Sequence, residues 1–563
     1  TYLATLLTSI LFFNTEIYGK ENITSYSKEN ISNYFSAVMS ASQDYNAKTL
    51  EHLNKIKSLK NSHTNFNIQF IRTLILLKKY EQAFIFAKEI WSKEELFFEA
   101  DLLLGLQALI HEKYDLAEIY FERINKISKI SSNFEDLLGN ILITWTMASK
   151  NEKKESFELL EKIPVHYGNL KKIQNSFLQC YFDTPNVQSS YEELINKDES
   201  NFPRYHFFLV NYLLYKNKNL EAKELIKVAT KLNNSNLLIR QTEKFLSKGD
   251  NKKIKKLFNC ENPKHVLAEF FYVLANLYST QNDYKSSNFY LNISFLLNDK
   301  FLPNKTLLAE NFFYQKKYER SKVIYNSLKS FGDIYSWYSS ISIAIIMEKN
   351  VTKEEAISYL EKEFNLLINP NYQHYYEFAN FYKDNEYYDK SIKFYSTALK
   401  KLSKDHFLIP KILDRRGTSY ERAGQWEKAE KDLLDSLNYL PDQPYVLNYL
   451  AYAWVEKNIN INKAIEMLER AVKLKEDDAY IIDSLGWAHF ASKNYSYAEI
   501  YLQRAVEILP LDPVINDHYA DTLWMLKKDL QARYFWQHVL SLDETEKELK
   551  EKVNKKIIFG VNQ

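Results

Sequence analysis

The chain has 563 residues, of which 45% are hydrophobic and 26% charged, a balance that suits a folded, water-compatible protein. Its 74 Lys and Arg against 72 Asp and Glu leave a net charge of +2, which argues against a nucleic-acid-binding surface spread over the molecule. Only 10 Gly and 11 Pro occur, so there is little material for tight turns or phosphate-binding loops, and the composition favours helices.

An apolar stretch opens the chain. Thr1 to Phe13 reads TYLATLLTSILFF, is too short to span a bilayer comfortably, and precedes a polar region that begins at Asn14. Gly19 offers a small residue at which a signal peptidase could cut. We therefore expect residues 1–19 to be a signal peptide that lacks its first residues. The alternative is an amphipathic first helix, although the stretch has no 3.6-residue apolar face.

Small side chains recur along the chain at a spacing close to 34 residues. In the C-terminal third, three columns of small residues share steps of 34 or 35, and one column extends to the front of the chain, which indicates about fifteen helical hairpins. Small residues let neighbouring helices approach, and stacking buries the apolar faces that one hairpin cannot bury. The column comprises Ala47, Ala83, Ala117, Ser156, Ala222, Ser287, Ser321, Ala356, Ser391, Ala429, Ala464, Ala498 and Ala532, with weaker copies near Ser190 and Ile254.

The two clearest copies follow the tetratricopeptide order of small, large and helix-stopping residues. Their spacing predicts an all-α fold, a right-handed superhelical solenoid of stacked tetratricopeptide helix-turn-helix repeats. In matching positions, one copy has Gly417, Ala429, Leu433 and Pro441, and the other has Gly486, Ala498, Leu502 and Pro510.

The clarity of the repeats varies along the chain and predicts five segments. The Lys-rich stretch within residues 232–262 is the best candidate for a hinge, although a solvated helix face explains it equally well. The segments are a truncated signal peptide (1–19), a degenerate N-terminal array (20–262), a central array (263–409), well-defined C-terminal repeats (410–546), and a capping helix with a tail (547–563).

Motifs for catalysis are absent from the sequence. There is no HExxH, Gly-x-Ser-x-Gly, Gly-x4-Gly-Lys, Gly-x-Gly-x2-Gly or Cys-x2-Cys. His489 and His518 lie close to Asp483 and Asp517 in adjacent repeats, where a metal or acid-base pair can be imagined, but such histidines more often bond to backbone or carboxylate groups. We therefore predict that the protein is not an enzyme and has no catalytic residues, no cofactor and no metal.

The two cysteines, Cys180 and Cys260, are separated by about two repeats. In a stacked array this separation predicts sulfur atoms too far apart to bond, so both thiols are expected to be free.

The segment from Asp414 to Leu542 resembles exported tetratricopeptide-repeat proteins of alphaproteobacteria. Its specific marks are DQPYVLNYL, YIIDSLGWA, and INDHYADTLW followed by Ala532 and Arg533. The resemblance implies a signal peptide, a long superhelix and no assigned enzymatic activity. The front half of the chain shows only the general layout.

In proteins of this kind, the first helix of each repeat lines the concave surface. The corresponding residues here predict an acidic and aromatic groove, which suits an extended polypeptide with basic and apolar side chains and disfavours a C-terminal carboxylate. The alternative is that Trp487 and Trp524 pack against neighbouring helices. The predicted protein-binding residues are Asp414, Glu421, Tyr445, Asn448, Tyr452, Tyr480, Asp483, Trp487, Asp517, Asp521 and Trp524.

The leading functional hypothesis is a non-catalytic scaffold or adaptor in the bacterial periplasm or cell envelope. It would hold extended segments or helices of other proteins, with no nucleic acid and no small-molecule substrate, and with peripheral membrane association as an option. One rival is the helical ring of a cell-wall enzyme such as a lytic transglycosylase. Another is an assembly factor that is anchored in the inner membrane or is cytoplasmic. The fold alone does not choose the partner.

Overall fold

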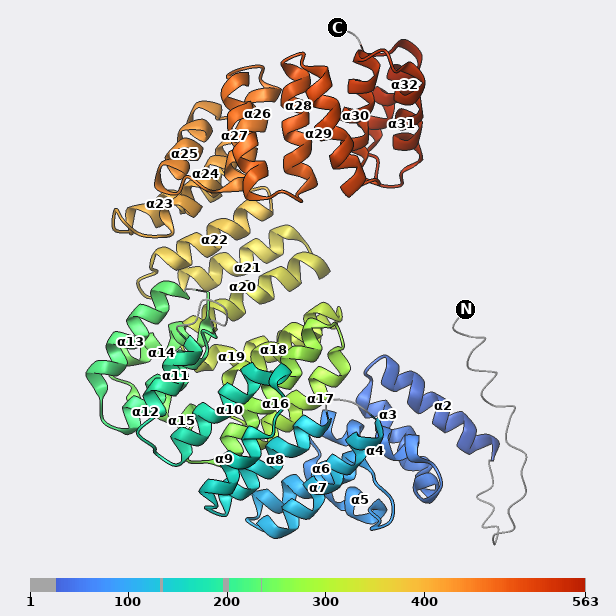
Figure 1. The fold of residues 1–563 in the computed structure, drawn as a ribbon, viewed down its shortest axis with the longest axis vertical. Helices are drawn as coiled ribbons and strands as arrows, with labels where there is room; N and C mark the ends of the chain where they lie inside the picture. Colours follow the sequence, from blue (N-terminus) through green and yellow to red (C-terminus); the bar gives the residue numbers. More distant parts are fainter. Residues whose placement is uncertain (1–26, 132–134, 196–201, 234, 562–563) are drawn as a thin grey trace. The chain divides into compact units, whose positions relative to one another are not determined.

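A computed structural model describes residues 27–131, 135–195, 202–233 and 235–561, so the signal peptide predicted for residues 1–19 lies outside the described residues. Regular structure in the described residues is helical throughout, with no β-strand among them, which confirms the predicted all-α solenoid of stacked hairpins (Figure 1). Within the same part of the chain, no helix is both long enough and apolar enough to span a bilayer.

The chain divides into two compact units, Thr1–Ile346 and Met347–Gln563, and the helix α20 (Asp333–Asn350) contains the division. The five segments predicted from the sequence stay a prediction. The helices of the first unit are α2 (Lys28–Ser42), α3 (Asn46–Lys55), η1 (Lys57–Asn61), α4 (Thr64–Leu76), α5 (Tyr80–Ile90), α6 (Phe98–Ile110), α7 (Tyr114–Ser131), α8 (Glu135–Ser149), α9 (Lys153–Glu161), η2 (Val165–Tyr167), α10 (Gly168–Tyr181), α11 (Val187–Ile195), α12 (Tyr205–Tyr215), α13 (Asn219–Leu232), α14 (Leu237–Ser247), α15 (Asn251–Leu257), α16 (Pro263–Thr280), α17 (Tyr284–Leu297), α18 (Leu302–Tyr314), α19 (Tyr318–Leu328) and η3 (Lys329–Phe331).

The second unit continues the same alternation of helices and short turns. Its helices are α21 (Lys353–Asn365), α22 (Tyr372–Asp384), α23 (Tyr388–Lys400), α24 (Ile409–Arg422), α25 (Trp426–Tyr439), α26 (Pro444–Glu456), α27 (Ile461–Leu474), α28 (Ala479–Ala491), α29 (Tyr495–Ile508), α30 (Pro513–Met525), α31 (Asp529–Ser541) and α32 (Lys547–Phe559).

Consecutive helices pair into hairpins. The described α-helices form fifteen successive pairs, from α2 with α3 to α30 with α31, and α32 follows the last pair. Inside each unit the two helices of a pair contact one another, and α32 packs against α31. The pair count agrees with the fifteen repeats expected from the spacing of small residues, because each repeat contributes one hairpin to the stack.

The column of small residues lies on the second helix of each hairpin. From Ala83 to Ala532 its alanines and serines, and Ile254, are fully buried, with Ser190 half-buried. The prediction was wrong for the first residue of the column. Ala47 is exposed on α3, and the buried position there is Thr49. Thr49 follows the N-cap residue of α3 by four positions, as Ala83 follows that of α5, so the helix start rather than the residue count sets the register.

The turns between paired helices use a residue in the left-handed region. In the hairpin of α4 and α5, Lys78 has φ +57° and its N–H donates to Ile75, while the N–H of Lys79 donates to Leu74, each at 2.9 Å. This pattern satisfies carbonyls that the end of a helix leaves open. Fourteen hairpins of the described residues have a positive-φ residue in this turn, and in twelve of them it is Asn, Asp, Lys or Glu instead of Gly. Tight turns are therefore built with very little glycine.

The helices α16 and α17 form the interior of the first unit. α17 contacts α4, and α16 contacts α8, across long stretches of sequence (Figure 1). Consistent with this position, residues 266–271 of α16 are buried on every side of the helix, including the charged Glu269, which accepts hydrogen bonds from Arg204 and Tyr205. The early hairpins thus pack on later ones, and the chain itself occupies much of the inner face of this unit.

Cys180 and Cys260 form a disulfide, so the prediction of two free thiols is wrong. The Cα atoms are 6.0 Å apart although 80 residues separate them in the chain. The hairpin of α14 and α15 is short, and after α15 the extended Phe258 packs its ring 5.6 Å from Phe177 of α10. This connection returns the chain to α10, which a count of repeats along an ideal stack does not anticipate.

Candidate functional site

The predicted protein-binding residues all lie on first helices of hairpins in the second unit. Among these first helices, α26, α28 and α30 are neighbours in succession, and α24 contacts α22. α24 has Asp414 and Glu421; α26 has Tyr445, Asn448 and Tyr452; α28 has Tyr480, Asp483 and Trp487; and α30 has Asp517, Asp521 and Trp524.

Three side chains at the start of successive first helices are open to solvent. Tyr445 is 60% exposed, Tyr480 is 58% exposed and Val514 is 46% exposed. Each is the second residue of its helix, after Pro444, Ala479 and Pro513 respectively, so the same repeat position recurs on α26, α28 and α30. We call these three residues the exposed row. Such apolar and aromatic side chains are the kind that anchor a bound polypeptide.

The middle of each first helix is more enclosed. Glu421 accepts a hydrogen bond from Tyr449 at 2.9 Å, and Asn448 is half-buried with a side-chain oxygen that has no donor among the described residues. Burial and the nearby carboxylates raise the pKa of Tyr452, so its hydroxyl stays protonated. These groups offer hydrogen bonds beside the exposed row.

Asp483 is buried and is paired with a histidine of the next repeat. His518 Nδ1 lies 3.0 Å and 3.1 Å from the two oxygens of Asp483. Burial alone would lower the pKa of His518, but Asp483, together with Asp517 and Asp521, outweighs it and the pKa is raised. The Trp487 ring stacks on His518 with centroids 4.0 Å apart, and its N–H donates to Glu456 at 2.9 Å. Trp487 therefore links α26, α28 and α30.

Asp517 and Asp521 are buried and share one lysine. Lys556 of α32 donates to Asp517 at 2.7 Å and 2.9 Å and to Asp521 at 2.7 Å. Burial and the adjacent Asp517 raise the pKa of Asp521, against the attraction of Lys556. Trp524 packs against Gly560, which follows α32, and a Cβ there would lie 2.1 Å from the indole. The end of the chain thus covers the acidic part of α30.

The acids predicted to line the groove are therefore mostly neutralised from within the protein. Asp483, Asp517 and Asp521 each have a cationic or histidine partner, and none of the three is open to solvent. The solvent-exposed side chains on the first helices of the second unit are chiefly those of the exposed row, and the polar groups of α26 lie beside them. A guest would meet aromatic and aliphatic surface before it met carboxylates.

Comparisons with known proteins agree with this architecture. No protein-family model matches the chain. A TPR repeat-containing protein of Pseudomonas aeruginosa is 31% identical over 99 residues, which cover 18% of this chain and 17% of that relative. The similarity to this TPR protein concerns 99 residues. The described hairpins combine the spacing expected for such repeats with the expected helical pairs.

Several solved structures are similar over longer stretches at low identity. The Cut9-Hcn1 hetero-tetramer of APC/C is 16% identical, with 84% of this chain and 97% of that chain covered and a TM-score of 0.36. The C-terminal part of a TPR repeat-containing protein from Cytophaga hutchinsonii is 16% identical, with 43% and 97% covered and a TM-score of 0.32. A tetratricopeptide repeat protein from Parabacteroides merdae is 18% identical, with 39% and 85% covered and a TM-score of 0.33. The export and the alphaproteobacterial origin implied by the resemblance stay predictions.

His489 and His518, the two histidines considered as a metal or acid-base pair, have different environments. His489 stacks on Tyr501 with an interplanar angle of 4°, and neither of its ring nitrogens has a hydrogen-bond partner among the described residues. His518 is held by Asp483 instead. Across the described part of the chain, no group of three or more His, Cys, Asp or Glu side chains is arranged to hold a metal ion.

Lys556 is the residue of this region that sequence reasoning missed. The segment 547–563 was expected to cap the array, and α32 does pack on α31. However, α32 contains five lysines, and no sequence signal distinguishes the one that reaches the carboxylates of α30.

Proposed function

We propose that this TPR protein is a non-catalytic scaffold that holds an extended segment or a helix of another protein on the row of first helices in its second unit. The observation that carries the proposal is the exposed row, in which Tyr445, Tyr480 and Val514 repeat one position on three neighbouring helices. Regularly spaced anchors on a rigid stack suit a guest chain whose side chains also recur at regular intervals.

We further propose that the protein works in the cell envelope. The disulfide between Cys180 and Cys260 supports this location, because such bonds persist in oxidising compartments and are rare in the cytosol. The apolar stretch at Thr1–Phe13 supports it independently, since it reads as the core of a signal peptide.

Site-specific photocrosslinking tests the binding face. The photoreactive amino acid p-benzoylphenylalanine replaces Tyr445 or Tyr480 in the full chain, and Tyr534 of α31, which is 67% exposed on a second helix, serves as the matched control. We expect both test positions to crosslink to the same protein, identified by mass spectrometry. We also expect the double variant Tyr445→Ser/Tyr480→Ser to bind that protein at least about tenfold more weakly.

Two results would contradict the proposed binding face. Equal crosslinking of one protein at residue 534, or unchanged affinity in the double variant with its helical content intact, would move the binding face away from the first helices. The envelope proposal has its own test. Cysteine alkylation in intact cells should find Cys180 and Cys260 oxidised, and reduced thiols in a cytosolic fraction would contradict it.

A further inference from the structure

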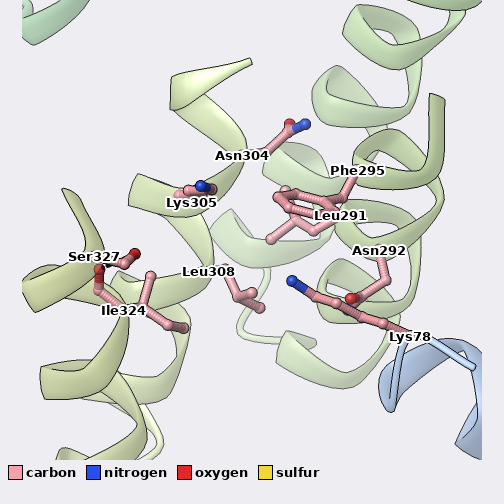
Figure 2. Close-up of a pocket in the computed structure, with 9 residues that line it drawn as sticks. All are labelled: Lys78, Leu291, Asn292, Phe295, Asn304, Lys305, Leu308, Ile324 and Ser327. Atoms are coloured by element: carbon pink, nitrogen blue, oxygen red, sulfur yellow. Dashed lines mark hydrogen bonds between the residues drawn. The ribbon is translucent and has the colours of Figure 1, made fainter. Parts of the chain in front are cut away.

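A cavity in the first unit lies far from the proposed binding face in sequence. Its volume is about 160 Å³, and it is lined by the turn that follows α4 and by α17, α18 and α19 (Figure 2). A second cavity of about 490 Å³ adjoins it, because both are lined by Lys78, Asn292, Leu308 and Ile324. The two cavities exist because early and late hairpins of this unit meet here.

The junction that creates the cavities is well packed around them. Tyr80 donates to the carbonyl of Asn292 at 3.0 Å, and Arg72 lies over the ring of Phe289. Lys317 forms an ion pair with Asp44 at the rim of the larger cavity. The cavities are therefore a feature of a folded contact between α4 and α17, and the side chains that line them are held in place from both sides.

Two lysines, Lys78 and Lys305, line the smaller cavity, and no carboxylate is among its lining residues. The ammonium of Lys78 lies 3.8 Å from the centre of the Phe295 ring, and that of Lys305 lies 5.6 Å from the same ring and 4.5 Å from Phe331. Neither has a salt bridge within the described residues, whereas the nearby Lys317 has one. Burial lowers the pKa of Lys78, and the charge of Lys305 lowers it further. Burial also lowers the pKa of Lys305, against the attraction of Asp299.

The remaining walls combine apolar surface with unused hydrogen-bonding groups. Leu291, Leu308 and Ile324 supply apolar side chains. Asn304 is 1% exposed, and its side-chain nitrogen has no acceptor among the described residues, although its oxygen accepts from Ser294. Two cations and a spare amide donor in the wall of a largely apolar space favour a ligand that carries negative charge.

The adjoining larger cavity is lined by both apolar and charged side chains. Its wall includes the apolar Leu76, Leu77, Phe312 and Val323, and its charged groups include Lys285 and Arg320 as well as Glu319. A molecule whose anionic end sits between the two ammonium groups could therefore lay an apolar body along the larger cavity.

We propose that this pair of cavities binds an amphiphilic organic anion, with a carboxylate or phosphate monoester head beside Lys78 and Lys305 and a short apolar chain toward Phe312. An anion there restores charge balance between two ammonium groups that now repel each other, and its chain leaves water for an apolar wall. The combined shape matches the usual ligand pocket, which is mostly apolar with a few convergent polar groups. The site is independent of the protein-binding face.

Isothermal titration calorimetry of the full chain tests the proposal with three probes that share one alkyl chain: sodium octanoate, octyl phosphate and uncharged octanol. We expect saturable binding of at least one anion with a dissociation constant below about 1 mM, and binding of octanol at least about tenfold weaker. The tighter of the two anions identifies the head group as a carboxylate or a phosphate.

Variants of the chain show whether the measured heat of binding comes from this pair of cavities. Lys305→Met should weaken anion binding about tenfold or more, and Leu308→Trp, which fills the space without altering charge, should do the same. Lys493→Met is the control for the loss of one lysine charge, because Lys493 lies in the turn between α28 and α29 and lines neither cavity, and it should bind like the unaltered chain. No saturation by either anion, equal binding of octanol, or full binding in a folded Leu308→Trp variant would each overturn the proposal.

Discussion

Lys556 neutralises two buried carboxylates at the C-terminal end of the solenoid. Asp517 and Asp521 are adjacent on one face of α30, so without a cation each would raise the cost of ionising the other. The ammonium of Lys556 reaches both, and these attractions outweigh its own burial and raise its pKa. A single side chain of α32 thus compensates the charge of two buried carboxylates.

Removal of this ammonium should weaken the fold. We expect Lys556→Met to lower the free energy of unfolding by about 3 kcal/mol, because it leaves two buried carboxylates without their cation. Urea unfolding followed by circular dichroism measures the change. Lys552→Met is the control, since Lys552 lies on the same helix but is exposed and pairs with the exposed Glu548, and it should leave the midpoint unchanged. Equal midpoints for both variants would contradict this account.

His518 gives the second unit a defined pH dependence. Its pKa is raised in the folded state, so the protonated pair with Asp483 stabilises fully below the unfolded pKa of about 6.5 and is lost as the pH rises through the folded pKa. We expect Asp483→Asn to destabilise the protein more at about pH 6 than at about pH 9. Unfolding midpoints across this range check it, with the exposed Asp477→Asn as control. A loss that is the same at every pH would argue against the charged pair.

At the scale of the helices, close approach between the two helices of a hairpin depends on missing side-chain atoms. A Cβ at Gly486 of α28 would lie 2.6 Å from Leu502 Cγ and 3.2 Å from the Leu502 backbone nitrogen on α29. Gly417 of α24 meets Leu433 of α25 in the same way, at 3.0 Å. The small-residue columns of the sequence thus have a direct steric cause in the hairpin.

Gly486→Ala should therefore destabilise the hairpin in spite of its better helix propensity. The alanine gains about 1 kcal/mol as a helix former, but overpacking costs about 1–3 kcal/mol, so we expect a net loss of about 1 kcal/mol. Chemical denaturation gives the value. Gly168→Ala is the matched control, because nothing lies within 4 Å of a Cβ at the start of α10, and it should be neutral or stabilising. A gain in stability at residue 486 would show that Leu502 moves aside freely.

The disulfide acts at the scale of the whole first unit. It joins α10 to the connection before α16 across 80 residues and so limits the freedom of the unfolded chain. We expect the double variant Cys180→Ser/Cys260→Ser to lose about 2–4 kcal/mol of stability. Scanning calorimetry with and without a reducing agent measures it. The reductant should lower the transition of the unaltered chain and leave the double variant unmoved, and an effect on both would mean that it acts elsewhere.

The first unit as a whole also brings early hairpins into contact with late ones. α4 meets α17 and α8 meets α16, so the first unit encloses its own helices and forms the cavities beside Lys78 and Lys305. The second unit presents its first helices differently, with the exposed row of Tyr445, Tyr480 and Val514 open to solvent. One repeat design therefore yields a closed interior in one unit and an accessible face in the other.

The sequence by itself determined the repeat. A spacing near 34 residues, small side chains in columns, and few helix breakers predicted fifteen hairpins, because local helix geometry and close packing act on neighbours in the chain. It also placed all the predicted groove residues on first helices. It erred at Ala47, where the start of α3 shifts the register to Thr49.

Only the tertiary structure decided which residues far apart in the chain meet. The disulfide of Cys180 with Cys260, the reach of Lys556 to Asp517 and Asp521, and the pairing of Lys78 with a cavity beside Phe295 all depend on how hairpins curve around one another. That curvature is the sum of small rotations between repeats. A one-dimensional period does not encode those rotations, since each depends on the packing of many side chains at once.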